Sequence, residues 1–228
     1  MIHRLASLTA AALFAAVSLA SAGSVSGIVT LTGKAPAPAI IKVNSQKFCV
    51  PFHPDGLKGE SIVASVAGGL KNVVVHIKGA TGGTAKTAPM VIAQKGCQYI
   101  PHVVALQVGE PLRVTNEDDT LHNIHGRPTA NKPFNFGQPK AGLTKDVMFD
   151  KEEFIPVKCD VHGWMSSYIA VFADPYFAVT GDDGSFKIDG LPAGTYEIEA
   201  WQEKLKTVSA KVTVAAGDAK VNLSFAAK

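Results

Sequence analysis

A short run of metal-binding side chains near residue 160 places the strongest constraint on how this chain can fold. Cys159, His162 and Met165 follow one another directly after the apolar run of residues 154–157. A thiolate, an imidazole and a thioether in this order are typical of a metal site at the end of a strand. With a second His in the trigonal plane and a weak axial Met, such donors form a blue-copper site. The fold must therefore bring one upstream His to this loop.

The rest of the chain alternates short apolar segments with Gly, Pro and acidic turns, which predicts an all-β fold. Strands are expected over residues 24–32, 72–78, 102–108 and 112–116. The Pro, Asn and Gly content of residues 126–140 predicts a long surface loop. His53, His76 and His102 are interpreted as loop or strand histidines without a ligand role. Chain order leaves His122, just after one strand, as the candidate upstream His.

The N-terminus has the features of an export signal over residues 1–22. Arg4 supplies the positive segment, residues 5–19 the apolar segment and residues 20–22 an A-x-A cleavage site. We expect a periplasmic mature chain that begins near Gly23 and has no transmembrane span. Removal of Arg4 lowers the formal charge from +3 by one, to +2. This mild charge without a basic block argues against a nucleic-acid partner.

The three cysteines of an exported chain allow one disulfide and one free thiol, or no disulfide at all. Cys159 is assigned as the free thiolate because His162 and Met165 give it a ligand role. Cys49 and Cys97 are then expected to form the disulfide. Three inert, buried thiols are the alternative.

Several of these features together resemble the cupredoxin family of blue copper proteins, of the amicyanin and plastocyanin type. They are a Tyr-x-Pro followed by an alternating strand, a strand that ends in Asn116, the sequence Leu-His-Asn at 121–123, and the Cys-x2-His-x2-Met group. The resemblance covers residues 89–174. It implies a Greek-key β-barrel or sandwich that binds one copper ion.

The resemblance also implies a role for each matching residue. His122, Cys159 and His162 would be the equatorial copper ligands and Met165 the axial ligand. Asn123 would steady the ligand loops through backbone hydrogen bonds. His125 does not belong to the pattern, and it could compete for the metal, lie behind the ligands or be exposed to solvent.

The last 50 or so residues resemble a second family, the carboxypeptidase regulatory-like or transthyretin-like β-sandwich. The pattern is strand, Asp-Gly turn, short strand, Leu-Pro-x-Gly turn and strand over residues 175–201. The first strand of such a module is found at the mature N-terminus instead. We therefore expect residues 23–88 and 175–228 to form one split sandwich, with the copper domain of residues 89–174 inserted. Two tandem domains are the alternative.

These features favour an exported type 1 (blue) copper protein that carries one electron and is not an enzyme. The electron would leave through the ring edge of His162, to a redox protein such as a c-type cytochrome or a periplasmic dehydrogenase. A periplasmic copper storage or delivery protein is the first alternative, and it is favoured if His125 opens the site. A structural β-module with a vestigial copper site is the second.

Overall fold

The chain is all-β, as predicted, in a computed structural model that describes residues 22–43, 46–83, 88–215 and 217–227. The expected export signal lies outside the described residues up to residue 21. The described part includes a short 3-10 helix, η1 (Val50–Phe52). No helix in this part of the chain has the length and apolar character needed to cross a membrane.

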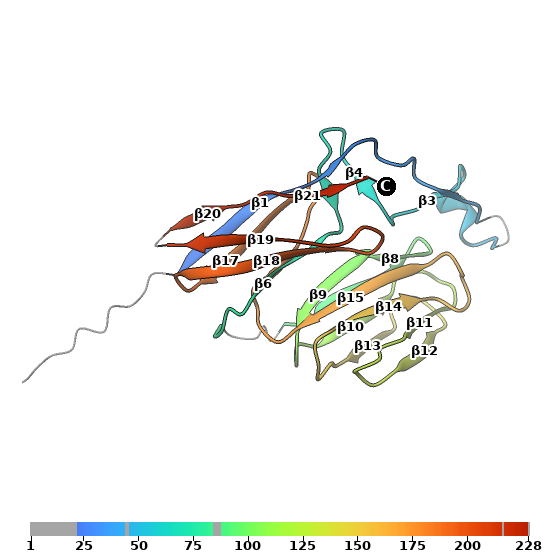
Figure 1. Ribbon diagram of the computed structural model, residues 1–228. Helices are drawn as coiled ribbons and strands as arrows, with labels where there is room; N and C mark the ends of the chain where they lie inside the picture. Colours follow the sequence, from blue (N-terminus) through green and yellow to red (C-terminus); the bar gives the residue numbers. More distant parts are fainter. Residues whose placement is uncertain (1–21, 44–45, 84–87, 216, 228) are drawn as a thin grey trace, which may run out of the picture.

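Two of the larger sheets are built from both ends of the chain (Figure 1). The first is centred on β1 (Gly23–Thr32), which pairs with β17 (Ser185–Leu191), β20 (Asp218–Lys220) and β21 (Leu223–Ala226). The second has the order β16 (Phe177–Val179), β6 (Val74–Lys78), β18 (Gly194–Gln202) and β19 (Lys206–Val214). Strands from before and after the central part of the chain thus pair with each other.

The other two larger sheets come from the central part of the chain. One has the order β13 (Thr144–Val147), β10 (Leu112–Asn116), β7 (Met90–Lys95) and β8 (Gln98–Ile100). The other has the order β12 (Phe134–Gln138), β11 (His122–Gly126), β14 (Glu153–Lys158), β15 (Ser166–Phe172) and β9 (Val103–Gln107). Two short pairs complete the strands: β2 (Ile40–Ile41) with β3 (Leu57–Lys58), and β4 (Val63–Ala64) with β5 (Leu70–Lys71).

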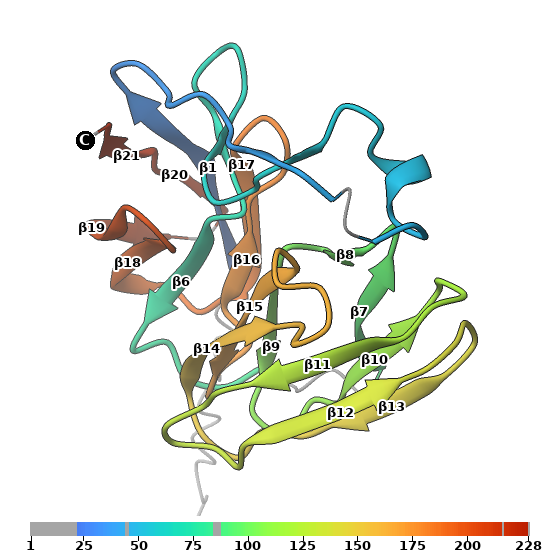
Figure 2. The same ribbon diagram turned by 90° about the vertical axis from the view of Figure 1, so that its right-hand side faces the viewer.

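The strand β12 corrects the expectation of a long loop over residues 126–140. Figure 2 shows β11 and β12 running side by side, and they are paired from His122 opposite Gln138 to Gly126 opposite Phe134. Phe134 and Phe136 pack against the core of the central sheets. Ladder hydrogen bonds and this apolar contact outweigh the turn preference of the neighbouring Pro, Asn and Gly residues.

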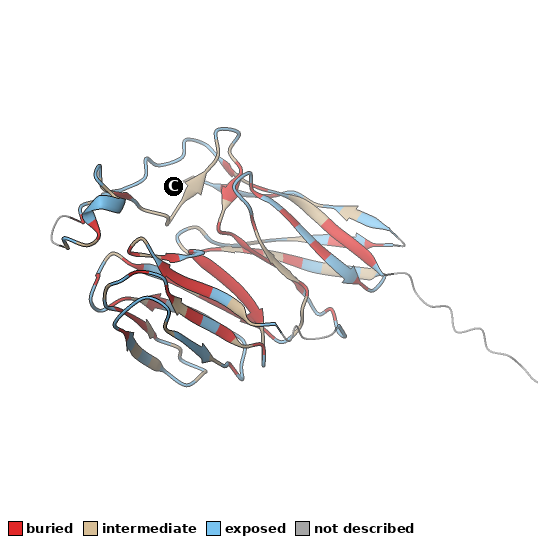
Figure 3. Ribbon diagram, turned by 180° about the vertical axis from the view of Figure 1, so that it is seen from behind, coloured by how far each residue is buried: buried red, intermediate tan, exposed pale blue. Residues whose placement is uncertain are grey.

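Alternation along the inner strands creates apolar cores between the stacked sheets. In β6, Val75 faces the core under β1, whereas Val74 faces a core that it shares with β9 and β15. In β15, Ala170 joins that shared core, whereas Ile169 faces the core between the two central sheets. Buried and exposed positions therefore alternate along many strands in Figure 3. The sheet of β6 and the sheet of β15 form the middle of the stack.

One part of residues 23–88 packs against the central sheets. Val43, Cys49 and Leu57 belong to the core between those sheets. The expected disulfide between Cys49 and Cys97 is present, and it joins this segment to the turn between β7 and β8. The segment of residues 46–58 is called the strap below.

Candidate metal centre

Cys159, His162 and Met165 lie on the loop between β14 and β15, which closes on itself through hydrogen bonds. The Cys159 amide donates to the Met165 carbonyl at 3.1 Å, and the Met165 amide donates to the His162 carbonyl at 2.9 Å. The His162 amide donates to the Cys159 sulfur at 3.3 Å. Both ends of the loop continue into paired strands, with Lys158 opposite Ser166. The short loop thus holds its side chains in fixed positions.

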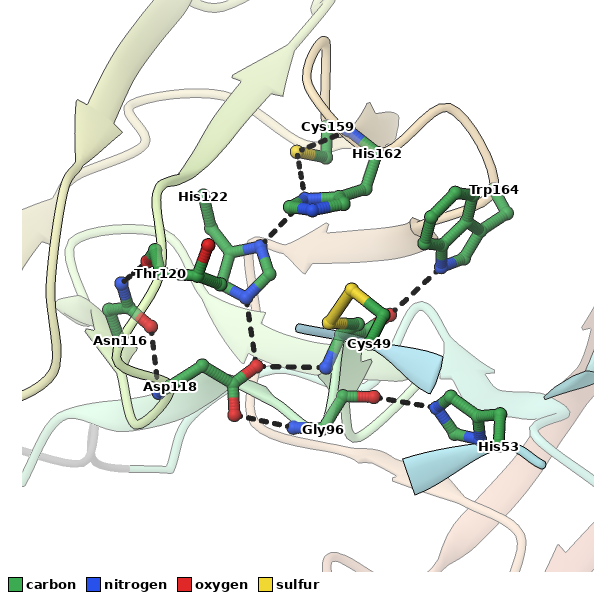
Figure 4. Close-up of a disulfide and its surroundings, with 11 residues drawn as sticks. Cys49, His53, Gly96, Asn116, Asp118, Thr120, His122, Cys159, His162 and Trp164 are labelled. Atoms are coloured by element: carbon green, nitrogen blue, oxygen red, sulfur yellow. Dashed lines mark hydrogen bonds and ion pairs between the residues drawn. A yellow bond between two sulfur atoms is a disulfide. The ribbon is translucent and has the colours of Figure 1, made fainter. Parts of the chain in front are cut away.

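His122 reaches the same place from the start of β11. Its Nδ1 lies 3.0 Å from Nδ1 of His162, and that His162 nitrogen lies 3.8 Å from Sγ of Cys159. The three donor atoms all lie within 4.8 Å of one another, and all three residues are buried (Figure 4). Met165 is buried in the same apolar cluster as Cys159.

The donor set fits a metal ion of the blue-copper type. A metal that takes nitrogen at about 2.0 Å and thiolate sulfur at about 2.3 Å needs donor atoms about 3 to 4 Å apart. The distances from Nδ1 of His162 to Nδ1 of His122 and to Sγ of Cys159 fall in this range. One thiolate and two imidazoles are the equatorial set of such a site.

Asp118 determines which nitrogen of His122 faces the other donors. Its carboxylate lies 2.8 Å from Nε2 of His122, so Nε2 carries the proton and donates it. The Nδ1 lone pair then points at His162 and Cys159. Hydrogen bonds of this kind fix the tautomer and orientation of metal-binding histidines. Sequence reasoning treated residues 117–119 as a polar turn and missed Asp118, although a carboxylate four residues before a candidate ligand was the available signal.

Both imidazoles are in the neutral form that a metal requires. Burial, and then the nearby His122, lower the pKa of His162 to about 4. Burial also lowers the pKa of His122, against the opposing effect of Asp118. At pH 7 both rings therefore offer a lone pair.

Asp118 also connects the site to the disulfide. Gly96 and Cys97 form the tight turn between β7 and β8, and both have positive φ angles, of 56° and 58°. A two-residue hairpin turn of this type requires positive φ at both positions. The Asp118 carboxylate accepts the amides of Gly96 at 2.7 Å and Cys97 at 2.8 Å. The same carboxylate thus holds the turn and the His122 ring (Figure 4).

The disulfide and Trp164 lie next to His162, whose ring edge is the predicted exit route for the electron. The sulfurs of Cys49 and Cys97 lie within 4.8 Å of a ring nitrogen of His162. The Trp164 ring lies 5.3 Å from the His162 ring, and its indole N–H donates to the Cys97 carbonyl at 3.1 Å. His162 is only 2% exposed. The strap brings the disulfide against the ring, and electron exit through the ring edge stays a prediction.

His125 lies away from the three donors. Successive side chains of a strand point to opposite faces, so residues 122 and 125 cannot share one. His122 faces the interior, whereas Nδ1 of His125 lies 2.9 Å from the Asp160 carboxylate. Asn123, on the same face as His125, accepts the Asp160 amide at 2.5 Å and so ties β11 to the ligand loop.

The other three histidines of the described chain also have partners outside the donor set. Nε2 of His53 lies 2.7 Å from the Gly96 carbonyl, beside the disulfide. His76 pairs with Asp174 at 3.0 Å and stacks on Phe172. His102 lies between the Ser166 carbonyl and Glu203.

Comparison with protein families gives a partial match. The family described as polysaccharide lyase family 4, domain II, matches residues 152–221. The latter part of this region is the part whose sequence resembles the carboxypeptidase regulatory-like family. No curated protein matches the chain.

Solved structures that resemble the chain include three copper proteins. A Cu-containing nitrite reductase from Thermus scotoductus SA-01 is 21% identical over 41% of this chain and only 25% of its own, with a TM-score of 0.33. An amicyanin variant with Cu(I) is 17% identical over 42% of this chain and 97% of its own, with a TM-score of 0.33. A purple cupredoxin from Nitrosopumilus maritimus is 22% identical over 36% of this chain and 98% of its own, with a TM-score of 0.31. At these TM-scores the three structures are too different from this chain to identify its site. The donor set is therefore defined only by the distances given above.

Proposed function

We propose that this chain is a copper-binding one-electron carrier with a type 1 site. The observation that carries the proposal is the convergence of three buried donors, Nδ1 of His122, Nδ1 of His162 and Sγ of Cys159, within 4.8 Å. Met165 is the proposed axial ligand, because it closes the same loop. Bound copper would supply one-electron chemistry by exchange between Cu(I) and Cu(II).

The protein's own part is to keep the donors in one arrangement. The ladder between β14 and β15 and the hydrogen bonds within the ligand loop hold Cys159 and His162. Asp118 holds the tautomer of His122. Donors that keep their positions in both oxidation states need little reorganisation when an electron arrives, which favours a carrier. All three donor side chains are shielded from solvent, which does not favour a substrate site.

The placement of His125 bears on the alternative of copper storage or delivery. That alternative is favoured if His125 opens the site. His125 instead pairs with Asp160 on the other face of β11. We therefore propose the carrier alone.

The proposed partner is another redox protein, such as a c-type cytochrome or a periplasmic dehydrogenase, and the proposed location is the periplasm. Leu121 precedes His122 and is 44% exposed, and Val161 precedes His162 and is 39% exposed. Apolar side chains next to two ligands suit a small, transient contact. Export agrees with the signal features of residues 1–22 and with the disulfide.

Optical and electron paramagnetic resonance spectra of the Cu(II)-loaded protein test this proposal. We expect intense blue absorption with compressed hyperfine splitting for the wild type. Cys159→Ser should lose the blue absorption completely and keep its far-ultraviolet circular dichroism. His125→Ala is the matched control and should keep the wild-type spectrum. A weak, tetragonal wild-type spectrum, or blue absorption in Cys159→Ser, would overturn the proposal.

A further inference from the structure

A buried cluster of charged side chains lies where the sheets from the chain ends meet the central sheets. His102 precedes β9, and its side chain is 5% exposed. Its Nε2 lies 3.3 Å from the carboxylate of Glu203, whose side chain is 7% exposed. Its Nδ1 lies 3.1 Å from the Ser166 carbonyl and 3.9 Å from the Glu60 carboxylate. Glu60 lies at the edge of the cluster, with its side chain 32% exposed. Burial of polar side chains such as His102 and Glu203 is costly unless they are paired, which indicates a built arrangement.

The Ser166 carbonyl determines the orientation of the His102 ring. A carbonyl only accepts hydrogen bonds, so Nδ1 of His102 donates to it. Nε2, on the other side of the ring, then contacts the Glu203 carboxylate. The Tyr168 hydroxyl lies near the Glu203 carboxylate. Burial, and then this carboxylate, raise the pKa of the hydroxyl.

Gln202 places both carboxylates around the ring. Its side-chain oxygen accepts the amides of Lys204 and Leu205 at 2.8 and 2.9 Å, which shapes the turn that carries Glu203. Its side-chain nitrogen donates to the Ser61 carbonyl, next to Glu60. Gln202 is itself buried. The turn between β18 and β19 is thus held against the central sheets.

The ring contacts the residue that directly follows the proposed axial ligand. Ser166 begins β15 and comes after Met165. The His102 backbone carbonyl also accepts the Ser167 hydroxyl at 2.8 Å and the Tyr168 amide at 3.0 Å. A cavity of about 170 Å³ is lined by Met165, His102, Glu60 and Glu203 together.

We propose that His102 is a positioning residue through which the sheet of β18 and β19 holds the Met165 end of the ligand loop. Glu203 fixes the ring, and the ring fixes the Ser166 carbonyl. The effect on copper rests on the proposed function, whereas the hydrogen-bond chain does not need the metal. The turn after β18 would then control how Met165 approaches the site, and the axial ligand tunes the potential of blue-copper sites.

Nuclear magnetic resonance of the copper-free protein tests the chain of contacts first. We expect the Nδ1–H of the His102 ring to be protected from exchange with solvent in the wild type, because it donates to the Ser166 carbonyl. Glu203→Gln should shift the His102 ring resonances and the backbone amide resonances of residues 165–167. Glu197→Gln is the matched control, because it makes the same change in the same hairpin, on β18, at a side chain that faces Lys78. Free exchange of the His102 Nδ1–H with solvent, or unchanged amide shifts in Glu203→Gln, would overturn the inference.

Copper loading then separates this inference from the proposed function. We expect Glu203→Gln to shift the Cu(II) hyperfine splitting and the reduction potential, and Glu197→Gln to leave both unchanged. A normal blue spectrum in Glu203→Gln would overturn the positioning role alone. Failure of the wild type to bind copper would overturn the proposed function. The measurements on the copper-free protein would still show whether Glu203 and His102 hold the Ser166 carbonyl. Should Glu203→Gln not fold, Glu60→Gln removes the second carboxylate, and we expect smaller shifts of the same resonances.

Discussion

At the scale of single residues, Asp118 has the widest influence on the candidate site. Its carboxylate accepts hydrogen bonds from the His122 ring and from the amides of Gly96 and Cys97. An Asn at this position would turn an NH2 group toward at least one of these donors. The substitution would therefore disturb the tautomer of His122 and the turn that carries the disulfide.

We predict that Asp118→Asn weakens copper binding by roughly 10- to 100-fold, as is typical when the hydrogen-bond partner of a metal-binding His is lost. Competition with a chelator of known affinity measures the change. Asp119→Asn is the control, because it makes the same change at the exposed neighbouring position. Equal affinities for the two variants would contradict the role assigned to Asp118.

At the scale of elements, Glu153 ties the connection between β11 and β12 to the start of β14. Its carboxylate accepts hydrogen bonds from the amides of Thr129, Ala130 and Asn131 and from the Thr129 hydroxyl. Burial alone would raise the pKa of Glu153, but the bonds from Thr129, Asn131 and Ala130 outweigh it and lower the pKa to about 2. The folded state therefore favours the ionised carboxylate.

The lowered pKa gives the contribution of Glu153 to stability a defined pH range. The contribution is complete above the ordinary value of 4.5 and is lost as the pH falls toward about 2. We predict that Glu153→Gln lowers the free energy of unfolding by about 1 kcal/mol at pH 7, after allowance for solvent screening. Urea unfolding should show the difference from the wild type shrinking between pH 5 and pH 2. Glu152→Gln, at an exposed neighbour with a single bond to the Ala173 amide, should show a smaller change.

At the scale of the whole molecule, aromatic side chains join the two middle sheets. Trp201 of β18 stacks on Phe154 of β14 at a centroid distance of 4.5 Å, and it meets Tyr168 of β15 edge-on at 5.2 Å. These contacts make Trp201 part of the packing between the two sheets.

We predict that Trp201→Ala lowers the free energy of unfolding by about 2 to 3 kcal/mol, below the range for a fully buried aromatic residue, because Trp201 is only half-buried. Urea unfolding of the two proteins at one pH measures the loss. Phe52→Ala removes an aromatic side chain that is 51% exposed and should have little effect. A loss no larger than that of Phe52→Ala would show that the aromatic contact does not stabilise the stack.

Local patterns predicted the all-β class and the disulfide correctly. They missed features that depend on contacts with distant segments of the same chain. The Pro, Asn and Gly content of residues 126–140 predicted a loop where the structure has β12. This composition carries no information on the pairing of β12 with β11. The separation of His125 from the donors could have been predicted, since residues three apart in a strand face opposite sides. The contact between Asp118 and the turn at Gly96 could not, because it joins two separate turns.

The sequence by itself determined the ligand loop, because Cys159, His162 and Met165 lie within one short connection that closes through its own backbone hydrogen bonds. It also determined that Cys49 and Cys97 were available to pair once Cys159 was assigned as a ligand. Only the tertiary structure decided that the disulfide lies against His162, that Asp118 orients His122, and that Glu203 contacts His102. Each of these contacts joins residues from different elements. Their distances follow from how the sheets stack and pair, and no local pattern encodes them.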